Sequence, residues 1–162
     1  QEKPEPAPET LVIAGASVTP RLRAALGAYR HPLFGTLTLE DRAGAIGARL
    51  HLPLDPESLN HNGGLHAGAM FTAAETAALL SCFAALGRTE ATCHTKTCEL
   101  RFRKPARSEL WASAQLREET LTGLGERLTA EGKVDVPVLV ELTDAAGERI
   151  AEGTITVSVR RI

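Results

Sequence analysis

One acidic side chain, Glu75, lies in the middle of the most apolar stretch of the sequence. From Leu65 to Leu86, 22 residues, it is the only formally charged residue. On an apolar helix a carboxylate loses part of its hydration, which makes it a stronger base unless hydrogen bonds stabilise the anion. Glu75 is therefore a candidate general base. The alternative is that it occupies a solvent-facing line of the helix or pairs with an arginine.

The loop before this stretch, LNHNGGLHAG, could supply the group that complements a base. Gly63-Gly64 permits a tight turn, and a helix that starts after it leaves unpaired backbone N–H groups next to His66 and Ala67. Such donors stabilise the oxyanion that forms when a carbonyl is attacked. A Gly-Gly turn and a lone histidine are also common in loops with a purely structural role, so both interpretations remain open.

The three cysteines do not indicate a metal site. The spacing of Cys93, His94 and Cys98 matches no zinc motif, and strand alternation would direct these side chains to different faces of a sheet. Cys82 lies in the apolar stretch and is expected in the core. The sequence therefore predicts no metal ion, and nothing in it calls for a cofactor.

Four basic residues surround the end of one predicted strand: Arg101, Arg103, Lys104 and Arg107. Arg101 and Arg103 are two residues apart, so they share a strand face and could meet the same anionic ligand. The alternative is that these basic residues lie on a solvent-exposed outer face and bind no ligand.

The elements that must position these residues follow from hydrophobic periodicity. The apolar stretch favours a helix that stops before Gly87, and a helix apolar nearly all round must be covered by other elements. Alternating apolar and polar residues predict strands; these are 33–40, 45–54, 94–104, 108–118, 133–143 and 149–160. A short helix is expected after Thr19-Pro20, a hairpin turn at 41–44, and a short helix or irregular excursion at 121–131. Pro137 falls inside a predicted strand and should force an edge position or a bulge.

Short turns between consecutive strands make them antiparallel. The expected fold is therefore α+β, a curved antiparallel sheet wrapped around one long central helix. Residues 1–18 are expected to form a flexible tail, since prolines are concentrated there, and residues 19–162 to form a single domain.

Composition excludes several classes of function. The chain has 162 residues, a formal charge of −2 and only 4% aromatic residues, which argues against a nucleic-acid partner. Its apolar stretch carries Glu75 at its centre and has no second copy, so we expect no membrane span. Three cysteines are too few for a disulfide scaffold and suit a reducing, cytoplasmic location.

The run from Asn60 through His66-Ala67-Gly68 to Glu75 resembles the N-x5-H-G-G-x6-(D/E) signature of hotdog-fold acyl-CoA thioesterases. It is most similar to the branch that contains phenylacetyl-CoA and 4-hydroxybenzoyl-CoA thioesterases. The segment 101–106, RFRKPA, resembles the segment that closes the next strand in that family, and the hairpin at 144–147 and Gly153 also fit. The resemblance covers roughly residues 31–160.

The resemblance implies a hotdog fold and an acyl-CoA substrate, with a catalytic role for four residues. Glu75 would be the general base or the nucleophile, and the backbone N–H of Ala67 would polarise the thioester carbonyl. Asn60 would orient the water or the carbonyl, and His66 would shape the loop and contact the thioester. Ala67 stands where the family usually has glycine, which keeps the N–H but adds a methyl group.

The resemblance also implies how substrate and subunits are arranged. The helix would contribute Gly68, Met70, Phe71 and Leu79 to substrate binding, and the CoA phosphates would meet Arg101, Arg103 or Lys104. The site would lie between two subunits of a homodimer, often paired again into a tetramer.

Two other functions remain open on the same fold. One is a binding module that holds acyl-CoA without hydrolysing it. The other is a hydratase or dehydratase of enoyl or hydroxyacyl thioesters, which would need a paired histidine and acid. His66 precedes Glu75 by nine residues, a spacing that resembles the thioesterase pattern rather than the wider dehydratase one.

Overall fold

A computed structural model of the chain describes residues 11–13, 16–18, 38–39, 48–86 and 91–162. The helix predicted after Thr19-Pro20 and the hairpin predicted at 41–44 lie outside these residues, as do most of the strand predicted at 33–40 and the start of the strand predicted at 45–54.

The described elements follow the predicted order. The first half contains β1 (Leu11–Ile13), β2 (Ala16–Val18), β3 (Thr38–Leu39), β4 (Arg49–Leu52), a 3₁₀ turn (Pro56–Ser58) and the long helix α3 (Ala67–Leu86). The second half contains β5 (Ala91–Phe102), β6 (Leu110–Gln115), α4 (Glu118–Leu121), α5 (Leu124–Glu131), β7 (Lys133–Thr143) and β8 (Arg149–Arg161). β1 and β2 pair with each other within the segment expected to be a tail.

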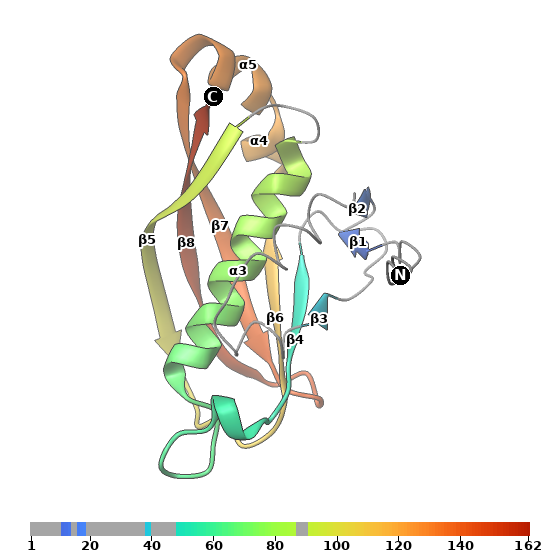
Figure 1. The fold of residues 1–162 in the computed structure, drawn as a ribbon, viewed down its shortest axis with the longest axis vertical. Helices are drawn as coiled ribbons and strands as arrows, with labels where there is room; N and C mark the ends of the chain where they lie inside the picture. Colours follow the sequence, from blue (N-terminus) through green and yellow to red (C-terminus); the bar gives the residue numbers. More distant parts are fainter. Residues whose placement is uncertain (1–10, 14–15, 19–37, 40–47, 87–90) are drawn as a thin grey trace, which may run out of the picture.

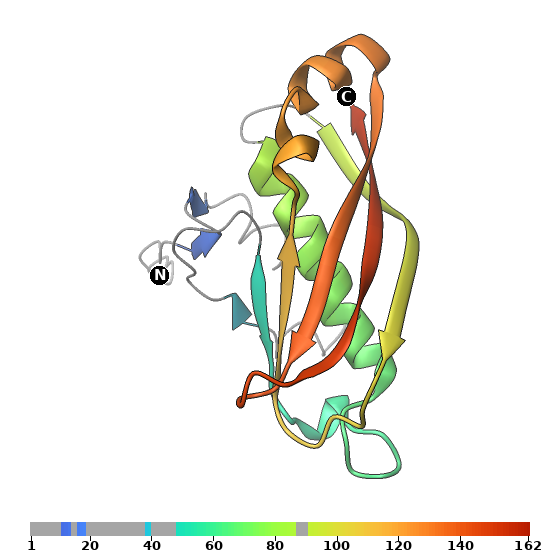
Figure 2. The same ribbon diagram turned by 180° about the vertical axis from the view of Figure 1, so that it is seen from behind.

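Six strands form one antiparallel sheet in the order β3-β4-β6-β7-β8-β5. α3 lies obliquely across one face of this sheet, which we call the inner face (Figure 1). Figure 2 shows the molecule from the opposite side, with the outer face of the sheet toward the viewer and β7 and β8 in front of the helix. This arrangement confirms the predicted α+β class and the single helix against an antiparallel sheet.

The core lies between α3 and the inner face. The helix contributes mainly alanines, whose short side chains let it lie close to the sheet, and the sheet contributes branched residues. They include Ala73, Ala74, Ala77 and Ala78 from α3, Val134, Val136, Val138 and Val140 from β7, and Ile155, Val157 and Val159 from β8. α3 is also long and apolar enough to cross a membrane, but 67% of its most apolar window is buried inside the fold.

The boundaries of several elements differ from prediction by a few residues. The strand at 133–143 matches β7, whereas β5 begins three residues before the predicted strand and α3 begins two residues after the predicted helix start. The excursion expected at 121–131 contains the last residue of α4 and all of α5. Gly123 and Gly132, at φ +73° and +72°, bound α5 on both sides, and Leu124 and Leu128 anchor it in the core.

Pro137 lies in an interior strand and is paired without a bulge to Thr156 of β8. The bulge is therefore not found, and the alternative, an edge position, holds only locally. The reason lies on the other side of β7, where β6 pairs only over Leu139–Thr143. Pro137 is past the end of β6, so its missing N–H leaves no ladder hydrogen bond unmade on that side.

β5 is an edge strand with a bulge in its middle. Thr95 pairs with Val157 and Thr97 with Thr156, so Lys96 is the extra residue. Because paired residues share a face, Thr95 lies with Val157 on the inner face and Thr97 with Thr156 on the outer face. The bulge therefore resets the alternation, and Cys98, two strand positions after Thr95, again lies on the inner face.

Candidate active site

The loop before α3 is shaped by the side chain of Asn60. Its Oδ1 accepts hydrogen bonds from the backbone N–H groups of Asn62 (2.8 Å) and Gly64 (3.1 Å), and its Nδ2 donates to the carbonyl of Leu65 (3.4 Å). The structure thus places Asn60 as the residue that closes its own loop.

The start of α3 is fixed from two sides. The N–H of Leu65 donates to the carbonyl of Ala106 (2.8 Å), and the N–H of His66 donates to the carbonyl of Ser58 (2.7 Å). Gly64 lies so close to the loop between β5 and β6 that a Cβ atom there would be 2.7 Å from the carbonyl oxygen of Ala106. The glycine is required because the two backbones touch.

His66 caps the helix with its ring. Its Nδ1 accepts a hydrogen bond from the N–H of Gly68 (2.8 Å), so the neutral ring carries its proton on Nε2. The N–H of Ala67 has no acceptor among the described residues. The helix start therefore leaves the backbone N–H of Ala67 free, where the sequence predicted a free donor.

Glu75 is half-buried on α3 and is held by one neighbour. Thr95 Oγ1 on β5 donates a hydrogen bond to Glu75 Oε1 across 2.5 Å. No arginine or lysine pairs with this carboxylate among the residues that the structure describes, so the arginine partner considered from sequence is not found there. Thr95 was not predicted, because nothing in the sequence relates two residues 20 positions apart.

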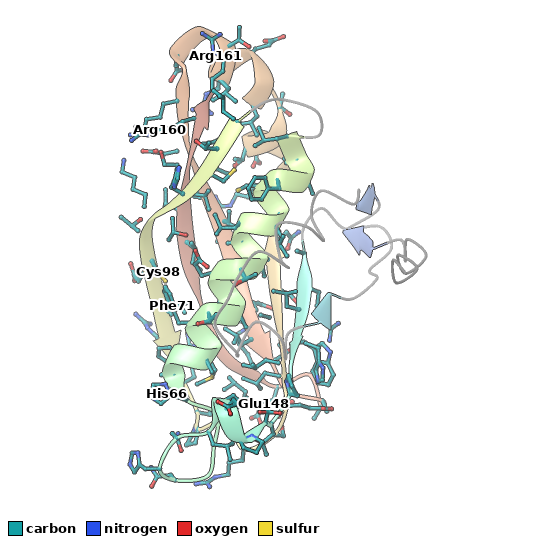
Figure 3. All side chains as sticks on the ribbon, viewed as in Figure 1. His66, Phe71, Cys98, Glu148, Arg160 and Arg161 are labelled. Carbon is teal, nitrogen blue, oxygen red and sulfur yellow. The ribbon has the colours of Figure 1, made fainter. Side chains whose placement is uncertain are left out.

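Cys98 also lies near this carboxylate. Burial raises the pKa of its thiol, and the negative charge of Glu75 raises it further. Figure 3 labels Cys98 on β5 and Phe71 on α3, both above His66 at the helix start. The bulge thus brings both Thr95 and Cys98 to the helix face that carries Glu75.

The predicted catalytic residues fall into two groups within one chain. Asn60, His66 and Ala67 are together at the helix start, whereas Glu75 follows Ala67 by eight residues on the same helix. At 1.5 Å per residue, this separates the free N–H from the carboxylate by about 12 Å along the axis.

A groove of about 600 Å³ opens at the helix start, beside the loop. It is lined by Asn60, Asn62, Gly64, Leu65, Ala67, Met70, Phe102, Arg103, Lys104, Pro105, Ala106 and Arg107. Three of the predicted substrate-binding residues, Met70, Arg103 and Lys104, are thus in its wall.

The other predicted substrate-binding residues are elsewhere. Phe71 is 39% exposed on α3, Gly68 donates its N–H to His66, and Leu79 is buried in the core. Arg101 lies opposite Glu152 of β8 in the strand register, so it is on the outer face of the sheet, away from the groove. Arg101 is therefore not part of the groove wall that contains Arg103, although the Arg103 side chain also reaches Glu152.

Two of the three cations in the groove are already neutralised. Arg103 forms an ion pair with Glu152, and Lys104 forms one with Glu148, both from the end of the sheet where β7 turns into β8. Hydrogen bonding to Arg103 holds the pKa of the Glu152 carboxyl below its usual value. Arg107 has no ion-pair partner among the described residues, and nothing in the sequence distinguishes it from its neighbours.

The described part of the chain holds no group of three His, Cys, Asp or Glu side chains that could bind a metal ion. None of Cys82, Cys93 and Cys98 forms a disulfide.

Residues 22–159 match a protein family described as a domain of unknown function, DUF4442. No curated protein matches the chain. Among solved structures, it is similar to a Pseudomonas aeruginosa protein of unknown function described as a probable thioesterase. The two are 26% identical with a TM-score of 0.70, over 91% of this chain and 98% of that one.

Two further structures are thioesterases or members of a thioesterase family. A Haemophilus influenzae thioesterase has a TM-score of 0.70 at 15% identity, covering 93% of this chain and 95% of its own. A thioesterase family protein of Silicibacter pomeroyi has a TM-score of 0.68 at 20% identity, covering 88% and 97%. The likeness confirms the predicted hotdog fold.

Proposed function

This chain belongs to the DUF4442 domain family, and we propose that it is a thioester hydrolase that acts on acyl-CoA. The observation that carries the proposal is the pairing of two features on one helix. Glu75 is a half-buried carboxylate fixed by a hydrogen bond, and Ala67 offers a free backbone N–H at the helix start. The 26% identity to the Pseudomonas protein described as a probable thioesterase supports the same reaction class.

In the proposed reaction the Ala67 N–H donates to the carbonyl oxygen of the thioester. The partial positive charge of the α3 start adds to this donor, and both stabilise the oxyanion of the tetrahedral intermediate. Glu75 either takes a proton from the attacking water or attacks the carbonyl carbon itself. The C–S bond then breaks, CoA leaves as the thiol, and water supplies the oxygen of the released acid.

The two groups must come from different copies of the chain. Reacting atoms have to approach to about 3–3.5 Å, whereas Ala67 and Glu75 of one helix are about 12 Å apart. A second copy could supply the missing half, with Glu75 of one protomer facing Ala67 of its partner. β5 supports such an assembly, because one side of this 12-residue edge strand is unpaired among the described residues.

Substrate recognition would use the groove at the helix start. Its apolar wall, from Met70, Phe102 and Pro105, suits the thioester arm, and its cationic rim suits phosphate. Arg107, the cation without a carboxylate partner there, is better placed to bind phosphate than Arg103 or Lys104. The motif resemblance puts arylacyl thioesters such as phenylacetyl-CoA first in the panel of substrates, and a reducing cytoplasm is the compartment that we propose.

The first experiment measures release of free CoA from a panel of acyl-CoA thioesters with a thiol-reactive dye. We expect Glu75→Gln to lower kcat/KM by about 100-fold or more, because a general base contributes about 10²–10⁴. Glu126→Gln on the exposed side of α5 is the matched control and should leave the rate unchanged. A fully active Glu75→Gln protein would contradict the proposed role. Binding without turnover would favour the binding module, and hydration of enoyl-CoA would favour the hydratase.

The second experiment tests whether the site is shared. Ala67→Pro removes the N–H at the first helical position, where proline is tolerated, and should lower kcat by about 10²–10³. Mixing this inactive variant with inactive Glu75→Gln would create heterodimers in which one of the two sites is intact. Activity should therefore return on mixing, with subunit exchange followed by mass. No recovery despite exchange would show that both groups act within one chain or not at all.

A further inference from the structure

We infer that Thr95 is a positioning residue for the proposed reaction, because its hydroxyl fixes one carboxylate oxygen of Glu75 so that the other is presented to the reactants. This role rests on the proposed thioester hydrolysis, but the hydrogen bond itself does not. Thr95 Oγ1 and Glu75 Oε1 are 2.5 Å apart, a separation typical of a hydroxyl that donates to an ionised carboxylate.

The hydrogen bond from Thr95 engages one carboxylate oxygen of Glu75 and leaves the other free. A threonine hydroxyl has one proton to donate, and an ionised carboxylate can only accept. Oε1 is therefore committed to Thr95, while no hydrogen bond engages Oε2 among the described residues. Oε2 is then the oxygen that takes the proton from water or attacks the carbonyl carbon.

Glu75 needs a hydrogen-bond partner because its position on α3 does not fix its side chain by packing. Its side chain is only half-buried, one turn after the half-buried Thr72, and has three rotatable bonds. Without a fixed contact it would sample several rotamers, and most of them would turn Oε2 away from a bound thioester. Holding a reacting group in one geometry removes this cost before the reaction begins.

The bulge in β5 explains why this threonine, and not its neighbour, reaches the carboxylate. Thr95 lies on the inner face with Val157, and Thr97 lies on the outer face with Thr156. The extra residue, Lys96, has no strand partner and is tied on the outer face to Asp135 of β7, with Nζ and Oδ2 2.5 Å apart. β-Bulges recur next to active sites, where they re-aim a side chain.

Three substitutions separate the hydroxyl from the rest of the side chain. Thr95→Val keeps the shape but removes the donor, Thr95→Ser keeps the donor but removes the methyl group, and Thr97→Val removes a hydroxyl on the other face of the same strand. We expect Thr95→Val to lower kcat by about 10–100-fold with KM changed less than about twofold, since misplacement of a reacting group costs up to about 10². Thr95→Ser should restore kcat to within about threefold of the original rate, and Thr97→Val should not change it.

Each result has a definite meaning. An unchanged kcat in Thr95→Val overturns the inference. A Thr95→Ser protein as slow as Thr95→Val also overturns it, because packing of the methyl group would then be the cause. An equal loss in Thr97→Val would assign the effect to the strand as a whole.

A measurement without substrate keeps this test independent of the proposed function. Urea unfolding is followed for Thr95→Val, for Glu75→Leu, which cannot accept the hydrogen bond, and for the double variant. If the hydrogen bond exists in solution, the midpoint shifts of the two single variants do not add, and the double variant unfolds close to the less stable single one. Additive shifts overturn the inference even if the protein is a thioesterase. Non-additive shifts in a protein without thioesterase activity would show the bond but refute the function.

Discussion

His66 gives the sharpest test of how the helix start works, because its ring can have two separable roles. In the structure Nδ1 accepts a hydrogen bond from the N–H of Gly68, which caps α3. The same ring leaves Nε2–H available to contact a thioester carbonyl. His66→Ala removes both functions, whereas His66→Asn keeps a side-chain acceptor at a position where asparagine is among the best helix caps.

The expected magnitudes follow from the loss of one cap bond on an exposed helix end. Replacing a capping side chain by alanine costs about 0.5–2 kcal/mol, typically about 1 kcal/mol. For a chain of this length, 1 kcal/mol lowers Tm by about 2–4 °C. The loop that carries Ala67 should loosen as well, and we expect His66→Ala to lose about tenfold in kcat/KM through misplacement of the Ala67 donor.

The assay compares thermal unfolding and CoA release for both variants, with His61→Ala as the control. His61 is an exposed histidine of the same loop and has no hydrogen-bond partner among the described residues. If the ring acts as a cap, His66→Asn regains both the Tm and the rate. A His66→Asn protein that regains the Tm but not the rate would refute this reasoning and assign Nε2–H to the thioester. No loss of Tm in His66→Ala would refute the cap.

Three further outcomes are expected. Ser81→Ala should lower the free energy of unfolding by about 1–3 kcal/mol in urea titrations, because it leaves the buried N–H of Ala48 without its 2.8 Å acceptor. Gly153→Ala should give little folded protein by circular dichroism, since its Cβ would lie 1.8 Å from a backbone oxygen of β5. Iodoacetamide should alkylate Cys98 more slowly at pH 8 than a free thiol, because burial and the charge of Glu75 raise its pKa; Glu75→Gln should speed the reaction.

Much of the fold could be predicted because its elements are encoded locally. The 22-residue stretch with one charge indicated α3, and apolar alternation at Val134, Val136 and Val138 indicated β7. Periods of 3.6 and 2 residues are visible in a single sequence, since they depend only on which face of an element is buried. The exact ends were less predictable, because they depend on caps and pairing, as the ring cap of His66 shows for α3.

Part of the candidate site could also be predicted, because some of its residues are close together in the sequence. Asn60, His66 and Ala67 belong to one loop and helix start, so their proximity follows from their order in the chain. Glu75 stood out because a charge is rare in such an apolar helix. The free N–H of Ala67 was also foreseeable, since the first turn of any helix lacks intrahelical acceptors for its N–H groups.

The contacts between distant strands were not predictable. Whether the groove cations are neutralised depends on carboxylates far along the chain, since Arg103 pairs with Glu152, 49 residues away, and Lys104 with Glu148, 44 residues away. Arg103 lines the groove, whereas Arg101 lies beside Glu152 on the outer face and does not line it. Such outcomes depend on register, and a slip of one residue reverses the face of every side chain in a strand.

The sequence by itself thus determined a lone carboxylate on an apolar helix, a loop with free backbone donors before it, and strands to cover them. Only the tertiary structure decided that Thr95 meets Glu75, because one extra residue in β5 sets which side chains face α3. Local patterning fixes which face of an element is buried, but the partner of a polar group is chosen by the packing of elements far apart in the chain.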